Sequence, residues 1–201
     1  MKKPLTAVVL TAFNRPKYIK QALASHEKID ADYFCFIDYS PIWKEIMDIV
    51  LGKKWYQVIC RNERMGISEN TKDAINTVFG LGYEQIIHLE DDLVLDEGAL
   101  EYLQSVLGLY KDDKEFGCAS LYEGEGFKCY GWGTWKDRWE KVDWTIADSW
   151  ESNLDYYFKR ENLLCMNPRK SKVKHIGWNG ANYSYLDIFS IRRILRKLFS
   201  H

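Results

Sequence analysis

Three consecutive carboxylates, Glu90-Asp91-Asp92, directly follow an apolar run from Gln85 to Leu89 that is typical of a buried strand. Ligands of open α/β sheets bind at the carboxyl ends of the strands. Adjacent carboxylates repel one another unless a cation or water neutralises them. Because Mg²⁺ and Mn²⁺ commonly join one or two carboxylates to substrate phosphates, the cluster predicts a divalent-cation site beside a diphosphate. The alternative is a solvated acidic turn before the next helix.

Apolar runs and helical patterns alternate through the first half of the chain. Strands are expected over residues 5–11, 33–37, 56–60, 85–89 and 117–121. Helices are expected over residues 16–26, 41–50, 68–79 and 96–110. Ser68 and Asp96 have the side chains expected of N-caps for the last two helices. This alternation predicts an α/β fold, with a mostly parallel central sheet and helices on both faces.

The pattern changes after Leu121, where glycines are interleaved with Tyr130 and several tryptophans. We interpret this region as loops and short helices. Residues 1–185 are interpreted as one domain, with a nucleotide-sugar-binding half at about 1–95 and an acceptor half at 96–185. Residues 186–201 are predicted to form a basic amphipathic helix, which would contact a membrane surface, a second subunit or the domain itself.

The composition argues against several classes of protein. The 201 residues carry a net charge of −1, with basic residues interspersed among acidic ones, so nucleic-acid binding is not expected. The five cysteines include no CxxC pair, which argues against a zinc site or a disulfide framework and favours a reducing compartment. Cys35, Cys60 and Cys118 lie in apolar runs and are expected in the core. No apolar stretch reaches about 18 residues, so we expect a cytoplasmic protein, at most peripheral to a membrane.

Further motifs follow in order along the chain. Thr11-Ala12-Phe13-Asn14-Arg15-Pro16 closes the first expected strand, and Ile37-Asp38 closes the second. A turn from Arg61 to Gly66 precedes the acidic cluster, and the segments Tyr130–Trp139 and His175–Gly180 follow it. This series resembles glycosyltransferases of the A fold, family-two-like bacterial enzymes and N-acetylglucosaminyltransferase I in particular. The resemblance covers about residues 5–183.

The resemblance implies a nucleotide-sugar donor, with UDP as the expected nucleotide, and an acceptor that is a saccharide, a lipid-linked sugar or a protein. The residues that it places around the nucleotide are Thr11, Ala12, Phe13, Arg15, Asp38, Arg64, Gly66 and Asn70. Arg15 would face the diphosphate, and Asp38 would accept the N3–H of uracil. The alternatives are a surface charge at a helix start for Arg15 and a turn residue for Asp38.

The resemblance also implies a bound Mn²⁺ or Mg²⁺. Asp92 would be its main ligand, and Asp91 and Glu90 would contact the ribose, the donor sugar or metal-bound water. His175 would complete the metal or diphosphate site; the alternative for it is an ordinary loop histidine.

An inverting transfer needs a base to take the proton of the acceptor hydroxyl. In the similar enzymes this acid belongs to a Ser-Trp-Asp type motif at a helix start, and the chain has Asp148-Ser149-Trp150-Glu151. Glu151 is therefore the first candidate and Asp148 the second, with Asp137 and Asp155 as rivals. An acid that only stabilises the helix dipole is the structural alternative.

Three other functions compete with inverting sugar transfer. A retaining transferase would share the architecture. A sugar-1-phosphate nucleotidyltransferase would need a glycine-rich basic loop such as GxGxR after the first strand, and residues 11–16 contain no glycine. A carbohydrate-binding protein with a decayed site is the non-enzymatic alternative, against which the intact acidic cluster argues.

Overall fold

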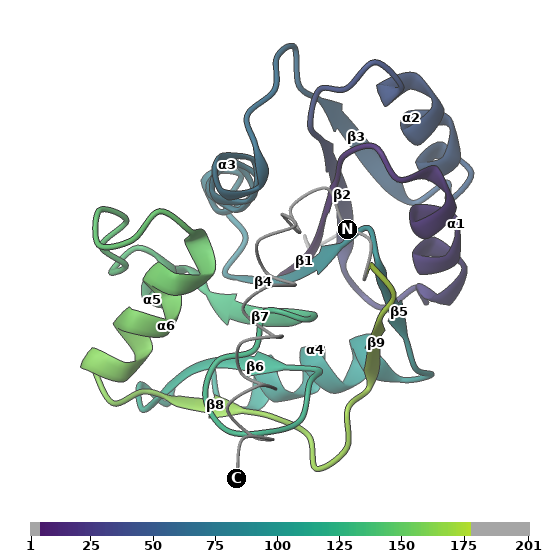
Figure 1. Cartoon of the computed structure of the whole chain (residues 1–201). Helices are drawn as coiled ribbons and strands as arrows, with labels where there is room; N and C mark the ends of the chain where they lie inside the picture. The colour runs from purple at the N-terminus through teal and green to yellow at the C-terminus, as the bar shows by residue number, and fades with distance from the viewer. Residues whose placement is uncertain (1–4, 178–201) are drawn as a thin grey trace, which may run out of the picture.

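The computed structural model describes residues 5–177, and a seven-stranded sheet forms the centre of this part of the chain (Figure 1). The strand order is β3-β2-β1-β4-β7-β6-β8. The strands are β1 (Thr6–Ala12), β2 (Asp32–Ile37), β3 (Tyr56–Cys60), β4 (Gln85–Glu90), β6 (Phe116–Ser120), β7 (Trp132–Trp135) and β8 (Leu164–Met166). β1 to β4 are parallel, whereas β7 runs antiparallel to β4 and β6. The prediction of a mostly parallel sheet is confirmed.

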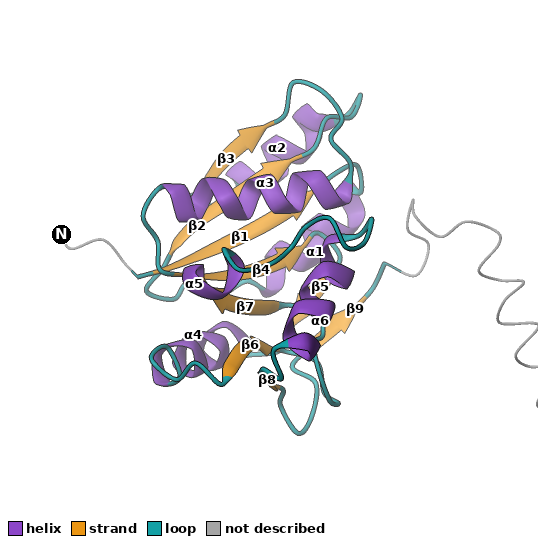
Figure 2. Ribbon diagram, turned by 90° about the vertical axis from the view of Figure 1, so that its left-hand side faces the viewer, coloured by secondary structure: helices purple, strands orange, loops and turns teal. Residues whose placement is uncertain are grey.

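Helices cover both faces of this sheet, as predicted. They are α1 (Pro16–Ser25), α2 (Trp43–Leu51), α3 (Ile67–Gly80), α4 (Ala99–Leu109), α5 (Lys136–Trp139) and α6 (Trp150–Arg160). Successive side chains of a strand point to opposite faces, so Val8 and Leu10 of β1 pack with α1, α2 and α4. Ala7 and Val9 face the other side, where α3, α5 and α6 lie (Figure 2).

A small two-stranded sheet joins two segments that are far apart in the sequence. β5 (Leu93–Leu95) pairs antiparallel with β9 (Val173–His175), and Leu93 lies opposite His175. β5 begins three residues after β4 ends, so this pairing brings the end of the described chain back to the acidic cluster.

The interpretation of residues 124–144 as loops and short helices is wrong for Trp132–Trp135, which form strand β7 inside the main sheet. All four residues are buried. A Cβ on Gly133 would lie 2.6 Å from the carbonyl oxygen of Ile86 on β4. The glycine that resembles a loop residue in the sequence therefore permits the close approach of two strands.

Both predicted helix caps are also wrong. α3 begins one residue before Ser68, whose hydroxyl instead lies 3.3 Å from the carbonyl oxygen of Asp148 and 3.2 Å from the backbone nitrogen of Trp150. Ser68 thus connects α3 to the start of α6. α4 begins three residues after Asp96, behind Gly98, which has a left-handed conformation.

Cys35 and Cys118 are fully buried, as expected, and Cys60 is partly exposed. None of the helices within residues 5–177 is long and apolar enough to cross a membrane. The expected amphipathic helix at 186–201 and residues 178–180 of the last motif lie outside the described residues.

Candidate active site

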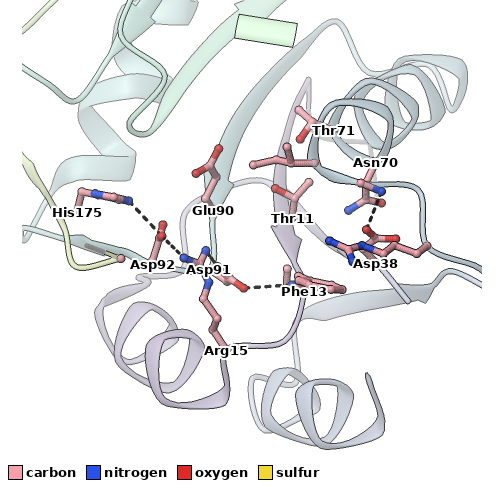
Figure 3. Close-up of a pocket in the computed structure, with 15 residues that line it drawn as sticks. Thr11, Phe13, Arg15, Asp38, Asn70, Thr71, Glu90, Asp91, Asp92 and His175 are labelled. Atoms are coloured by element: carbon pink, nitrogen blue, oxygen red, sulfur yellow. Dashed lines mark hydrogen bonds and ion pairs between the residues drawn. The ribbon is translucent and has the colours of Figure 1, made fainter. Parts of the chain in front are cut away.

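A cleft opens at the carboxyl ends of β1, β2 and β4, beside the start of α3 and the end of β9 (Figure 3). The space within it, with the open solvent at its mouth included, is about 830 Å³. Every residue expected to bind the donor or the metal lines it. The lining consists of Thr11, Ala12, Phe13, Arg15, Asp38, Arg64, Gly66, Ile67, Asn70, Thr71, Glu90, Asp91, Asp92, His175 and Gly177.

Asp91 connects the ends of β1 and β4. Its Oδ2 accepts a hydrogen bond of 3.1 Å from the backbone N–H of Phe13, and its Oδ1 pairs with the guanidinium of Arg15. Burial raises the pKa of Asp91 more than the Arg15 charge and the Phe13 N–H lower it. The carboxylate that the resemblance assigns to the donor is thus also a structural support of the first loop.

Asp92 contacts both the first loop and the segment after β9. It is 2% exposed, and its Oδ2 lies 2.7 Å from Arg15 Nη1 and 3.1 Å from His175 Nε2. Its backbone oxygen accepts a hydrogen bond of 3.0 Å from the N–H of Ile176. A Cβ on Gly177 would lie 1.9 Å from Asp92 Oδ2, so only glycine fits there. The segment after β9 therefore lies against the cluster and places His175 beside Asp92.

The fit of a divalent cation depends on one atom in particular. Asp92 Oδ1 is buried and has no hydrogen-bond partner among residues 5–177. A buried carboxylate oxygen without a partner is costly, and it is the ligand type that Mg²⁺ and Mn²⁺ prefer. No three His, Cys, Asp or Glu side chains of the described chain are grouped as a complete metal site. A cation there would take its remaining ligands from phosphates and water, as Mg²⁺ commonly does.

Glu90 lies at the inner wall of the cleft and is partly buried. Burial, together with the charges of Asp92, Asp91 and Glu151, raises its pKa to about 8 against the opposing effect of Arg15. At neutral pH and without a cation, this carboxyl therefore holds a proton. The ring of Trp150, in the first turn of α6, lies 5.3 Å from the ring of His88 two residues before Glu90, so this turn lies near the acidic cluster.

Asp38 supports the turn opposite the acidic cluster. Its Oδ1 accepts from the backbone N–H groups of Tyr39 at 2.9 Å and Met65 at 2.8 Å, and its Oδ2 accepts from Gly66 at 2.9 Å. Gly66 has a φ of 82°, a backbone conformation that residues with a side chain rarely adopt. Asp38 thus lies at the cleft. It also stabilises a turn, which was the alternative to base recognition.

Asn70 and Arg64 differ in what they offer a ligand. The Asn70 amide accepts from Arg61 Nε at 2.9 Å and donates to the Phe36 carbonyl at 3.3 Å, so it is held within the protein. Arg64 is exposed, and its guanidinium lies 4.8 Å from the ring centroid of Phe13. Arg64 is therefore available at the rim of the cleft, whereas Asn70 shapes its floor.

His88 was not expected to support the site, and it lies directly behind it. Trp132 Nε1 donates to His88 Nδ1 at 3.1 Å, which leaves the ring proton on Nε2, 3.0 Å from Thr11 Oγ1. Burial lowers the pKa of His88 to about 3, so the ring is neutral. The signal in the sequence was a histidine inside an apolar strand, two residues before Glu90.

The candidate bases fall in different places. Glu151 is partly buried in the first turn of α6 and lines a second groove with Phe127, Cys129 and Tyr130. Asp148 is exposed, and it lines neither the cleft nor this second groove.

The two rivals are engaged with basic side chains. Asp137 pairs with Lys114 and Arg138 at 2.8 and 2.7 Å. Asp155 lines the second groove but pairs with Lys159 at 2.6 Å. Glu151 lines the second groove, and its charge contributes to the raised pKa of Glu90.

No protein-family model and no curated protein matches the chain. Solved structures do resemble it. A protein of Desulfovibrio desulfuricans assigned to the nucleotide-diphospho-sugar transferases has a TM-score of 0.56 and 13% identity, over 96% of this chain and 97% of its own. A cytidylyltransferase of Leptospira borgpetersenii has a TM-score of 0.57 and 11% identity, over 98% and 96%. Residues 1–349 of S. aureus TarS give 0.58 and 14%, over 86% and 60%.

The chain has the nucleotide-diphospho-sugar transferase fold. Identities of 11–14% show the fold alone. Because a transferase and a cytidylyltransferase share it, the architecture does not separate sugar transfer from nucleotidyl transfer. That distinction depends on the side chains of the cleft.

Proposed function

We propose that the protein is a glycosyltransferase, which moves a sugar from a nucleoside-diphosphate donor to an acceptor hydroxyl. The observation that carries this proposal is the meeting of Glu90-Asp91-Asp92 with the Thr11–Phe13 strand end in one cleft, near the first turn of α6. Such a cleft offers a donor pocket on one side and a carboxylate, Glu151, on the side of a second groove.

The chemistry that these residues support is an inverting displacement. The acceptor oxygen would attack the anomeric carbon, Glu151 would take the hydroxyl proton, and the nucleoside diphosphate would leave with the electrons of the broken bond. Asp92 Oδ1, with His175 beside it, would hold a Mn²⁺ or Mg²⁺ ion. Such an ion neutralises the charge that develops on the departing diphosphate. Arg15 and Arg64 offer further positive charge at the cleft.

The donor nucleotide that we propose is UDP, because of the resemblance and the place of Asp38 in the cleft. With both carboxylate oxygens of Asp38 engaged by backbone N–H groups, any contact with the uracil N3–H would use a remaining lone pair. The acceptor would be a saccharide, a lipid-linked sugar or a protein. A cytoplasmic location at or near a membrane surface fits a lipid-linked acceptor.

Nucleotidyl transfer is the second candidate, since a cytidylyltransferase has the same fold. It needs backbone N–H groups after the first strand to cradle a triphosphate. Here the N–H of Phe13 is bound to Asp91, and the loop has no glycine. This observation favours sugar transfer. A retaining transferase and a sugar-binding protein without activity would share the donor cleft, and they differ from the proposal in the need for Glu151.

A thermal-shift panel of nucleotide sugars, with and without Mn²⁺, tests the proposal. Ligand at about 100 Kd stabilises a folded protein of this size by a rise in melting temperature of about 5–10 °C. We expect that rise from a UDP-sugar only when Mn²⁺ is present. A rise with CTP and a free sugar acid, and none with any nucleotide sugar, would establish nucleotidyl transfer instead.

A further inference from the structure

Arg15 already neutralises the carboxylates that a divalent cation would need. It stands at the N-cap of α1, and its Nη1 lies 2.7 Å from Asp92 Oδ2 while its second terminal nitrogen pairs with Asp91. Both aspartates are 2% exposed. Burial would lower the pKa of Arg15, but the two carboxylates outweigh this effect and raise it. The guanidinium thus stays protonated and places a positive charge inside the proposed metal site.

A cation and Arg15 therefore draw on the same carboxylate, that of Asp92. Asp92 Oδ1 is the buried oxygen left without a partner, whereas Oδ2 is shared by Arg15 and His175. A divalent ion at Oδ1 would stand close to the guanidinium, and two positive charges in a buried site repel each other strongly. The cluster can hold the ion well only if Arg15 moves.

Arg15 has both the freedom and a reason to move. Its side chain is 23% exposed and lines the cleft, so it is not locked in the core. A diphosphate in the cleft would offer it oxygens of higher charge in the fork geometry that guanidinium groups prefer. The face of Tyr18, 5.6 Å from the guanidinium carbon, gives the side chain a second support outside the acidic cluster.

We propose that Arg15 competes with the divalent cation for Asp92, and that the donor's diphosphate removes this competition by taking over the guanidinium. This inference rests on the proposed function, since it assumes a nucleoside diphosphate in the cleft. The cation then binds weakly to the empty protein and tightly to the nucleotide complex. By linkage, each ligand strengthens the binding of the other by the same factor.

Mn²⁺ binding to the nucleotide-free protein, measured by titration calorimetry, tests the competition without any turnover. We expect Arg15→Gln to bind Mn²⁺ at least about tenfold more tightly than the wild type, because the competing charge is gone. The same variant should bind UDP with Mn²⁺ at least about tenfold more weakly. The matched control is Lys17→Gln, which removes an equal charge from an exposed position on α1 and should change neither constant.

Mn²⁺ and UDP also bind each other directly, and they do so with either protein. The quantity to compare between the two proteins is therefore the factor by which UDP strengthens Mn²⁺ binding. It should be smaller in Arg15→Gln than in the wild type. Equal or weaker Mn²⁺ binding by nucleotide-free Arg15→Gln would overturn the inference, while Mn²⁺-dependent UDP binding by the wild type would leave the proposed function standing. Mn²⁺ binding by neither protein, with or without UDP, would overturn both.

The second variant is Arg15→Lys, which keeps the charge but loses the planar fork that pairs with Asp91 and Asp92 through separate nitrogens. We expect Mn²⁺ affinity between those of the wild type and Arg15→Gln. If Arg15→Gln fails to fold, as its circular dichroism spectrum would show, this variant decides the matter. An affinity equal to that of the wild type would then contradict the competition.

Discussion

The two sides of the cleft are built in different ways. On the donor side, β1, β2 and β4 are parallel and adjacent, so Phe13, Asp38 and Asp91 follow strand ends at one edge of the sheet. On the other side, the second groove lies between the irregular segment 125–130 and helix α6, which carries Glu151. The donor side is placed by regular strand pairing, whereas the acceptor side depends on particular tertiary contacts such as that of Ser68 with Trp150. The site is thus a regular half joined to an irregular one.

The largest effect is expected from a substitution of Asp92 on the donor side. Asp92→Asn removes the charge that faces Arg15, His175 and the proposed cation, so UDP-sugar turnover should fall about 10³-fold. UDP release with the donor found by thermal shift measures it, and the Mn²⁺-dependent stabilisation should vanish with it.

Asp96→Asn is the matched control, because it changes the same side chain four residues later at an exposed position. Its turnover should equal that of the wild type. Full activity in Asp92→Asn would remove the metal site from the donor side and with it the proposed mechanism.

The next effect separates the two sides functionally. Glu151→Gln should reduce transfer to the acceptor by about a hundredfold or more, while Mn²⁺-dependent UDP binding stays within about twofold of the wild type. Asp148→Asn, the control on the other side of Ser149, should leave both unchanged because Asp148 is exposed and outside both cavities. Loss of transfer in Asp148→Asn with normal transfer in Glu151→Gln would reassign the base.

A third prediction concerns the strand at which the two sides meet. In Gly133→Ala the new Cβ would lie 2.6 Å from the Ile86 carbonyl oxygen and 2.7 Å from Leu107 Cδ1, so the free energy of unfolding should fall by about 3 kcal/mol. Gly108→Ala, in α4 with nothing near its Cβ, should raise it by about 0.5 kcal/mol or more. Urea unfolding of both variants measures the difference. Equal stabilities would mean that β7 is not packed against β4 as described.

The smallest expected effect is the pH dependence of the His88 connection between β1, β4 and β7. Its folded pKa of about 3 is below the unfolded value near 6.5, so the unfolded chain binds the extra proton and stability falls as the pH drops through 6.5. Between pH 7 and pH 5 this residue should account for about 2 kcal/mol of lost stability. His88→Gln should lose correspondingly less stability over that range in urea unfolding. An unchanged pH dependence would show that the buried ring is not neutral.

Sequence reasoning recovered the donor side much better than the acceptor side. The parallel strands follow from long apolar runs, and the residues at their ends had to share one edge. The strand at Trp132–Trp135 was missed because four residues with a glycine give almost no periodic signal. Its place in the sheet depends on pairing with β4 and β6, which no local pattern encodes. The two caps were misassigned because Gly66 and Gly98 begin those helices by conformation and not by a side-chain bond.

The sequence by itself determined the α/β class, the order of the first strands and the acidic cluster, because burial of regular strands and helices leaves a periodic trace in the chain. The tertiary structure alone decided which oxygen of the cluster remains without a partner. That outcome depends on three groups from distant segments: the guanidinium of Arg15, the imidazole of His175 and Gly177, which has no Cβ to collide with Asp92. Contacts across 77 or more residues are set by packing, which the residue types permit but do not specify.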